Sequence, residues 1–453
     1  MFDSRWPLSS RIRMALSLVS ALMAALFIIS LLVGFYLYFF VPMNMEIPLG
    51  QMSIESDHPY SVGWEDRLIL TPSFPYASVR IRNLTLEEGD VFFIRDMTTG
   101  ETYKVDYNCT YMIIGVFHVN STGYLDILVN ITDDGDGLTS WGVLIDMVIT
   151  DIWVLDLFVS APIPGLPPLY IRVPAWGLAL ALQAIFAACF IIAFMEAGGF
   201  HKAVMESPEK PIGKCMKNFL YAMPFVATGA LVGIIALTML VEAAGVPAGP
   251  MWAWPGPVLL LLEGTYGALV EELIFRLLFI GAVLFIVVIS AHRRGAKGDG
   301  SEALKALFFP GWLRGDMKKA VRKVGWILVV ISSLAFGLAH SLGGGWAMGK
   351  AVTATIDGLV LGACYLLYGL HASLLLHWFR NYYLFSWWAL TYVTNSDTAY
   401  TIYILTSFFN MVFGILSLVM FLVQGIRLAS GRQRREKAKA WPYGWGIKSG
   451  KIA

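Results

Sequence analysis

The sequence predicts an all-α polytopic membrane bundle of eight transmembrane helices, with a small β-sandwich-like extracytoplasmic domain inserted after helix 1. Three observations lead to this fold class. The 453 residues are 57% hydrophobic and only 14% charged, which is far more apolar than an ordinary soluble domain. Apolar segments of about 20 residues or more recur along the chain. A stretch of short segments with alternating polarity follows the first of them.

Four parts follow one another along the chain. Residues 1–41 form a cytoplasmic N-terminus and helix 1, residues 42–172 the extracytoplasmic β domain, residues 173–426 a transmembrane core of seven helices, and residues 427–453 a basic cytoplasmic tail. Helix 1 is expected to be an uncleaved signal anchor, because its apolar run from Met14 to Val41 is too long for a signal peptide.

The β domain is predicted from short apolar and polar alternations that turn signals separate. The expected strands are 78–86, 90–95, 103–107, 112–119, 124–129 and 142–150. Four N-x-[ST] sequons favour a glycosylated, extracytoplasmic location; they begin at Asn83, Asn108, Asn120 and Asn130. The aspartate-rich stretch 133–137 is interpreted as a plain turn, because its spacing does not fit an EF-hand calcium loop.

The core is predicted from seven apolar segments, each long enough to cross a bilayer. They are 173–196, 217–244, 257–290, 325–343, 351–370, 372–393 and 401–426. With a cytoplasmic N-terminus, the inner segments 197–216 and 291–324 and the tail are rich in lysine and arginine. The outer loops 245–256, 344–350 and 394–400 contain one lysine, Lys350. This bias obeys the positive-inside rule and places both termini in the cytoplasm.

Charge and cysteine content exclude other classes. The formal net charge is +1, and the basic residues gather where they set membrane orientation, so no nucleic-acid partner is expected. The four cysteines include no C-x-x-C pair, which argues against a disulfide framework and against a zinc ribbon.

The stretch Val270–Leu278, VEELIFRLL, places three charges inside an apolar segment. Ionisable side chains at bilayer depth are costly and indicate a functional site. Glu272 and Arg276 are spaced i,i+4 on one helical face in the favourable order, so we expect them to pair. Glu271 points about 100° away and has no such partner on its own helix. An isolated carboxylate of this kind suits a general base that acts on water.

Two further polar positions lie in later segments. His340 ends the run FGLAH, and His377 precedes Asn381 by four residues in HWFRN. The i,i+4 spacing puts His377 and Asn381 on one face, where both can donate hydrogen bonds into one small volume. A base together with donors is what the attack of water on a carbonyl requires.

The order E-E-x-x-x-R, F-x-x-x-H and H-x-x-x-N resembles the CAAX prenyl endopeptidase and bacteriocin-processing (CPBP, or Abi) family, which includes the Ras-converting endopeptidase. The resemblance rests on Glu271, Glu272 and Arg276, on Phe336 and His340, and on His377 and Asn381, and it covers roughly residues 173–426. The domain at 42–172 is not part of the family core.

The resemblance implies an intramembrane glutamic protease that hydrolyses a peptide bond. By analogy with the family, Glu271 activates water with help from His340, and His377 and Asn381 stabilise the oxyanion. Glu272, Arg276 and Phe336 are then supporting residues. The expected partners are the lipid bilayer and a membrane-associated peptide or protein substrate, and nothing in the sequence shows that the substrate is prenylated.

Other interpretations stay open at the level of sequence. One carboxylate and two histidines, Glu271, His340 and His377, are also a ligand set for catalytic zinc, although H-E-x-x-H is absent and the family resemblance favours a metal-free site. The buried charges could instead line the path of a transporter or channel. A third interpretation is a noncatalytic scaffold or immunity protein on the same fold.

One expectation conflicts with the predicted helix boundaries. Glu271 lies about 21 Å along its helix from residue 257, whereas His340, counted from residue 325, falls in the outer half of the membrane. The two residues therefore come out at different depths. Another buried pair, Asp357 with Arg380, is expected to be structural, because the two residues lie in adjacent predicted helices.

Overall fold

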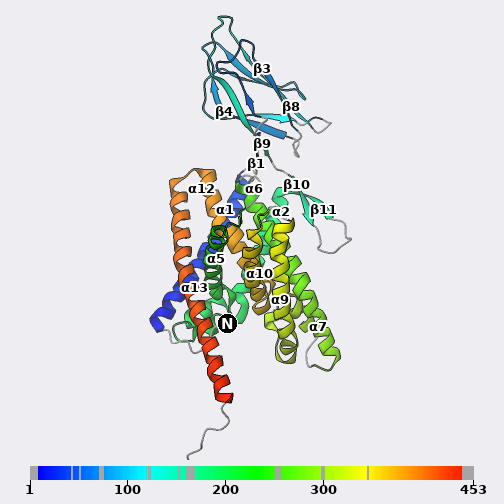
Figure 1. Cartoon of the computed structure of the whole chain (residues 1–453), viewed down its shortest axis with the longest axis vertical. Helices are drawn as coiled ribbons and strands as arrows, with labels where there is room; N and C mark the ends of the chain where they lie inside the picture. The colour runs from blue at the N-terminus through cyan, green and yellow to red at the C-terminus, as the bar shows by residue number, and fades with distance from the viewer. Residues whose placement is uncertain are drawn as a thin grey trace, which may run out of the picture.

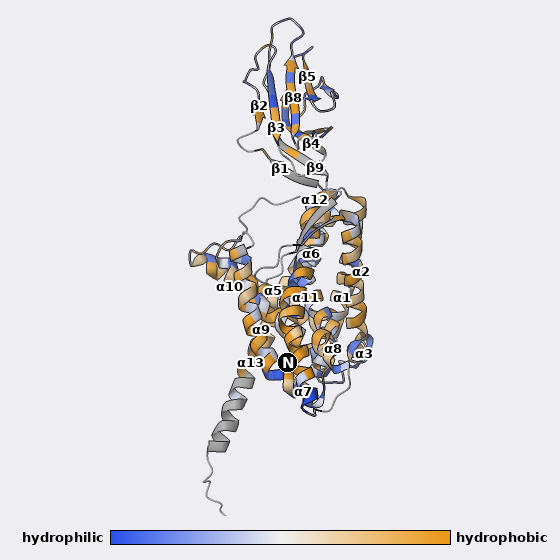
Figure 2. Ribbon diagram, turned by 90° about the vertical axis from the view of Figure 1, so that its right-hand side faces the viewer, coloured by the Kyte–Doolittle hydropathy of each residue, from blue (hydrophilic) through white to orange (hydrophobic). Residues whose placement is uncertain are grey.

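The computed structural model describes residues 9–41, 44–49, 53–70, 76–118, 120, 124–151, 154–159, 169–249, 257–296, 301–343 and 346–440. A bundle of long helices makes up most of the molecule, and a β-rich part extends beyond one end of it (Figure 1). The helices are predominantly apolar along their length, as Figure 2 shows by colour. The last residues of the predicted tail, 441–453, lie outside the described residues.

The bundle is built from helices close to the predicted apolar segments. They are α1 (Ser10–Phe40), α2 (Ala175–Met195), α5 (Phe219–Ala243), α6 (Pro257–Glu272), α7 (Ala282–Arg293), α9 (Gly315–Gly343), α10 (Gly349–Leu367), α11 (Leu370–Trp378), α12 (Leu384–Thr394) and α13 (Asp397–Ala440). Short helices lie between them: α3 (Phe200–Glu206), α4 (Ile212–Cys215) and α8 (Ser301–Phe308).

Two of the long helices contain a π-helical segment. Leu273–Gly281 joins α6 to α7, and Phe379–Tyr383 joins α11 to α12. Seven helices of the described chain are long and apolar enough to cross a membrane, which makes this a multi-pass membrane protein. The remaining predicted span, 372–393, corresponds to the interrupted helical run from Leu370 to Thr394, which is not among the seven.

One predicted boundary is wrong by ten residues. The segment expected at 325–343 is part of α9, which already begins at Gly315. The additional turns are amphipathic, because Met317 and Val321 are buried whereas Lys318 and Lys319 are exposed. A search for unbroken apolar runs therefore misses them.

The β part contains all six predicted strands together with five more. The strands are β1 (Asn44–Pro48), β2 (Ile54–Glu55), β3 (Glu65–Leu70), β4 (Tyr76–Thr85), β5 (Val91–Asp96), β6 (Thr102–Val105), β7 (Met112–His118), β8 (Leu125–Thr132), β9 (Gly142–Asp151), β10 (Val154–Val159) and β11 (Leu169–Pro174). One antiparallel sheet has the order β1-β9-β4-β7 with β2 also on β9, and a second has the order β3-β8-β5-β6. β10 and β11 form a separate pair that leads into α2.

The two larger sheets share one hydrophobic core. In β8, for example, Leu125, Ile127, Val129 and Ile131 are buried while the residues between them are not, as the period of two in a strand requires. They belong to the same buried cluster as Val79 of β4, which lies in the other sheet. This cluster is separate from the core of the helical bundle.

Glycines allow α9 and α10 to pack closely beside the candidate site. A Cβ atom on Gly337 would overlap the carbonyl oxygen of Ala351 and the hydroxyl of Thr355, and one on Gly358 would lie 3.0 Å from the Cα atom of Ser333. Small residues let the backbones of membrane helices approach in this way. This close contact holds the C-terminal half of α9, which carries His340, against α10.

We predict that Gly337→Ala lowers the thermal unfolding temperature of the purified protein by a few degrees, because the added methyl meets backbone atoms of α10. The matched control is Gly267→Ala in α6, where an added Cβ meets nothing within 4 Å. That variant is expected to unfold at or slightly above the wild-type temperature, because alanine favours helix. Equal behaviour of the two variants would contradict the close α9–α10 contact.

Candidate active site

The two adjacent glutamates lie at the end of α6, where the helix widens into its π-helical segment. Glu272 is fully buried, whereas the side chain of Glu271 is 30% exposed. Consecutive residues on a helix point about 100° apart, so one carboxylate faces the packed interior and the other stays accessible. This difference separates a structural carboxylate from one that a substrate can reach.

His377, near the end of α11, lies between both carboxylates. Its Nδ1 atom is 3.0 Å from Glu272 Oε1, and its Nε2 atom is 3.5 Å from Glu271 Oε2. The ring is buried, so these contacts replace hydration. A doubly protonated imidazole donates through both nitrogens and can hold the two carboxylates together.

His340, in the last turn of α9, approaches Glu271 from the other side. Its Nε2 atom is 3.7 Å from Glu271 Oε1. Its Nδ1 atom lies 2.9 Å from the backbone oxygen of Phe336, and a carbonyl only accepts, so Nδ1 carries the hydrogen. In the neutral ring Nε2 therefore presents its lone pair toward the carboxylate. Although Glu271 lacks a partner on its own helix, it lies against two histidines from other helices.

Arg276 compensates the charge of Glu272. Its Nε atom is 3.5 Å from Glu272 Oε2, and both side chains are almost completely buried, which confirms the predicted i,i+4 pair. The guanidinium also donates from Nη2 to the carbonyl oxygen of Gly358 at 3.4 Å. Since breaking a buried ion pair is strongly destabilising, this pair ties α6 to the interior.

Phe336 packs against Arg276 and both histidines. The Arg276 guanidinium carbon lies 4.6 Å above the centre of its ring. The same ring makes edge contacts with His340 at 4.6 Å and with His377 at 6.2 Å between centroids. One aromatic side chain therefore touches three of the predicted site residues.

Asn381 makes a different contact from the one expected of an oxyanion donor. Its amide donates to the backbone oxygen of Gly264 at 3.4 Å, two helical turns before Glu271 on α6. The structure thus brings together Glu271, Glu272, Arg276, Phe336, His340 and His377 and directs the Asn381 amide toward Gly264.

The depth conflict disappears because the helices are longer than predicted. From Arg293, the end of α7, Glu271 lies about 33 Å along the helix, and from Gly315, the start of α9, His340 lies about 37 Å along its helix. These two helix ends lie on the side of the bundle away from the sheets (Figure 1). Counted from the true start of α9, which includes the amphipathic turns, His340 lies at about the same depth as Glu271.

The zinc interpretation requires the donor atoms of Glu271, His340 and His377 to converge. Within the described ranges, the group whose ligand atoms all lie within 4.8 Å of one another consists of Asp90, Asp133 and Asp134 in the β part. The two histidines each approach Glu271 but do not form such a group with it. The donor atoms of these three side chains therefore do not converge on one point in this arrangement.

The comparison with known families agrees with the motifs. A family model described as "Rce1-like: Type II CAAX prenyl endopeptidase Rce1-like" matches residues 251–383. This part of the chain is similar to the Rce1-like prenyl endopeptidases. The match confirms the resemblance inferred from the motifs, over a shorter stretch than the 173–426 expected. None of the curated proteins compared with the chain matches it.

The Rce1-like segment contains two cations near the carboxylates that the sequence did not mark as site residues. Lys350, at the start of α10, lies over the Trp346 ring at 4.4 Å and within electrostatic range of Glu271. Arg380 interacts electrostatically with both glutamates and forms an ion pair with Asp357, which confirms that predicted pair. The sequence feature that could have drawn attention to Lys350 is that it is the one lysine of the predicted outer loops.

We predict that Arg276→Gln lowers the free energy of unfolding by about 3–5 kcal/mol, because it leaves the buried Glu272 carboxylate without its cation. Thermal and denaturant unfolding of the purified protein measure the change. The double variant Glu272→Gln, Arg276→Gln removes both charges and is expected to be more stable than Arg276→Gln alone. If the double variant is the less stable of the two, the ion pair is not what Arg276 contributes.

Proposed function

We propose that the protein is a CAAX-protease-like intramembrane endopeptidase in which Glu271 activates the attacking water. The observation that carries this proposal is the half-buried Glu271 carboxylate, which lies between His340 and His377 while its neighbour Glu272 is sealed in an ion pair. The match with type II CAAX prenyl endopeptidases over residues 251–383 supports the same reaction class.

The distance between Glu271 and His340 suits a shared water. At 3.7 Å the two atoms are too far apart for a direct hydrogen bond, but one water can lie about 2.8 Å from each of them. The water donates one hydrogen to the Glu271 carboxylate and one to the lone pair on His340 Nε2. Both contacts raise electron density on its oxygen and orient it for attack.

Glu271 carries one proton through both halves of the reaction. Glu271 takes a proton from the water as the water oxygen attacks the carbonyl carbon of the peptide bond, and the carbonyl π electrons move onto its oxygen. When this tetrahedral oxyanion collapses, the carbon–nitrogen bond breaks and the proton held by Glu271 passes to the leaving nitrogen. The products are a carboxylic acid and an amine, and Glu271 regains its charge.

We assign His377 and Asn381 to the oxyanion. The Nε2 atom of His377 lies beside Glu271, so a hydrogen on it is available where charge develops. Asn381 donates one amide N–H to the backbone oxygen of Gly264, and the second N–H of the same amide nitrogen is the one that we assign to the oxyanion. The developing oxyanion is a charged acceptor and strengthens such a hydrogen bond.

We further propose that the chain crosses the membrane eight times with both termini in the cytoplasm and residues 42–172 outside as a glycosylated sandwich. In support, Arg13 near the start of α1 donates to the backbone oxygens of Ser207 and Pro208, so two segments assigned to the cytoplasm meet at one end of the bundle. The β part lies beyond the opposite end (Figure 1).

We predict that Glu271→Gln folds normally and loses cleavage by about 100-fold or more, because the amide cannot take the proton from water. Cleavage is measured with the full-length protein in liposomes and a prenylated CAAX peptide, together with the accumulation of precursor proteins in cell membranes. The matched control is Glu263→Gln, an exposed glutamate two turns earlier in the same helix, which should cleave like wild type. If the Glu271→Gln variant cleaves at the wild-type rate, Glu271 is not the residue that activates water. Loss of ion flux without loss of cleavage would instead indicate a transporter.

We also predict that protein freed of metal by chelation keeps its full cleavage rate, because general base catalysis by Glu271 needs no Lewis acid. Elemental analysis confirms the removal, and the same peptide assay measures the rate. A rate that falls on chelation and returns with zinc would favour Glu271, His340 and His377 as metal ligands.

A further inference from the structure

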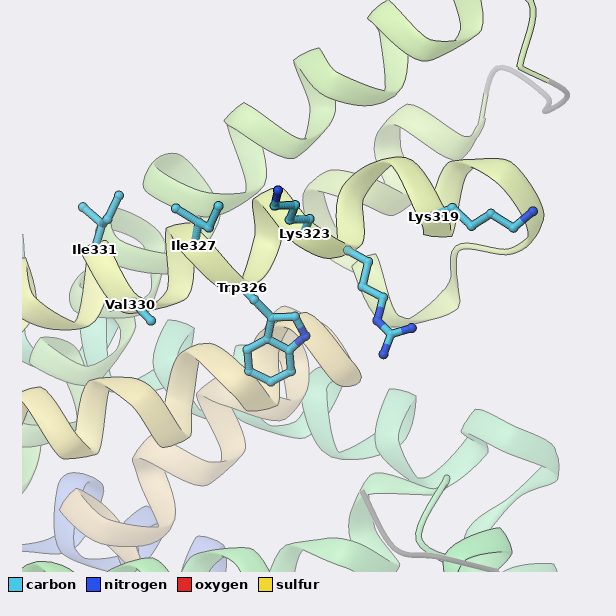
Figure 3. A pocket seen from close by; sticks show the side chains of 7 residues that line it. Lys319, Lys323, Trp326, Ile327, Val330 and Ile331 are labelled. Atoms are coloured by element: carbon cyan, nitrogen blue, oxygen red, sulfur yellow. The ribbon is translucent and has the colours of Figure 1, made fainter. Parts of the chain in front are cut away.

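The face of α9 that points away from the bundle has a pattern of its own. Residues of the opposite face are buried in the core, among them Met317, Val321 and Val329. The outward face instead carries Lys319, Arg322 and Lys323, then Trp326, then three branched aliphatic residues, Ile327, Val330 and Ile331 (Figure 3). Trp326 and these aliphatic residues are between 42% and 51% exposed, so no described part of the chain covers them.

These seven side chains line one hollow of about 640 Å³. Its charged side chains are all cations at one end, and its remaining wall is apolar apart from the indole nitrogen. From Lys319 to Ile331 the helix rises about 18 Å, close to the half-thickness of a bilayer core together with part of its headgroup layer. A ligand that fits has an anionic head and an apolar tail.

Among the described residues, two of the three cations have no ion-pair partner. Lys319 lies 3.2 Å from Asp316, one turn before it. For Arg322 and Lys323, the part of the chain that the structure describes offers no carboxylate within ion-pair distance. The hollow therefore holds uncompensated positive charge beside an apolar surface, and it is complementary to an anion that brings its own hydrocarbon.

The order along the helix agrees with a membrane boundary. Cations face lipid phosphates, an indole prefers the interface, and branched aliphatic residues face acyl chains. A soluble anion would leave the aliphatic wall without a partner, and a peptide would need unpaired acidic groups at bilayer depth. We propose that this face of α9 binds an anionic phospholipid, whose phosphate lies between Arg322 and Lys323 and whose acyl chain lies on Ile327, Val330 and Ile331.

This site is distinct from the carboxylate cluster and does not depend on the protein being a protease. It lies on the helix that carries His340, and its cations Arg322 and Lys323 are more than four turns before that histidine. A lipid held there fixes how far α9 extends into the membrane. Binding can therefore be tested in Glu271→Gln protein, whose cleavage activity plays no part in the measurement.

The experiment compares binding of phosphatidylglycerol and of phosphatidylcholine with identical acyl chains to the full-length protein, by native mass spectrometry from detergent. Wild type is expected to bind the anionic lipid at least tenfold more tightly. The variant Arg322→Gln, Lys323→Gln should lose about 30-fold in affinity for it, at roughly five- to sixfold per removed cation. Both changes are on exposed positions, and thermal unfolding checks that the fold is intact.

The matched control is Lys202→Gln, Lys214→Gln, which removes the same charge from two exposed positions of the 197–216 segment. It should bind the anionic lipid like wild type. Equal losses in both double variants would show a general charge effect and overturn the site. Equal binding of soluble glycerophosphate, or a change in oligomeric mass in the Arg322, Lys323 variant, would overturn it in favour of a free phosphate or a second copy of the chain.

Discussion

The constraint on which the bundle depends is charge compensation for two carboxylates on consecutive residues inside an apolar interior. Neither Glu271 nor Glu272 can remain ionised there without cations and donors, because the surrounding lipid and side chains do not solvate charge. Arg276 supplies one cation from the same helix, and His377 reaches both carboxylates from another. The helices carrying these groups must meet at one level, and this requirement determines how the bundle packs.

The packing around the two glutamates brings these helices to one level. Glycines let α9 approach α10, so that Phe336 lies against the Arg276 guanidinium and both histidines. The accessible Glu271 is then held by groups from two other helices, whereas Glu272 is enclosed. Identical side chains one residue apart acquire different chemistry because the helix turns one of them inward.

Much of this arrangement can be predicted from local patterns. Long apolar runs specified where helices form, and alternation specified six strands, because burial imposes those periods directly. The pair of Glu272 with Arg276 is implied by spacing within one helix, and that of Asp357 with Arg380 by adjacent segments. Contacts that depend on how the helices are rotated against one another could not be predicted from the sequence. Tertiary packing decides that His377 bridges both glutamates and that the Asn381 amide faces Gly264. The early start of α9 was missed because amphipathic turns lack an unbroken apolar run.

The two π-helical segments begin just after Glu272 and just after Trp378, so each i,i+4 pair of the motif, Glu272 with Arg276 and His377 with Asn381, spans the start of one. A π turn accommodates an extra residue within an α-helix and rotates the residues after it relative to those before it. The site is thus defined by a local change of helical pitch as much as by residue identity. For comparison with other chains, an alignment gap of one residue at either position matters more than a conservative replacement elsewhere, because it would present a different face of the helix to the carboxylate cluster.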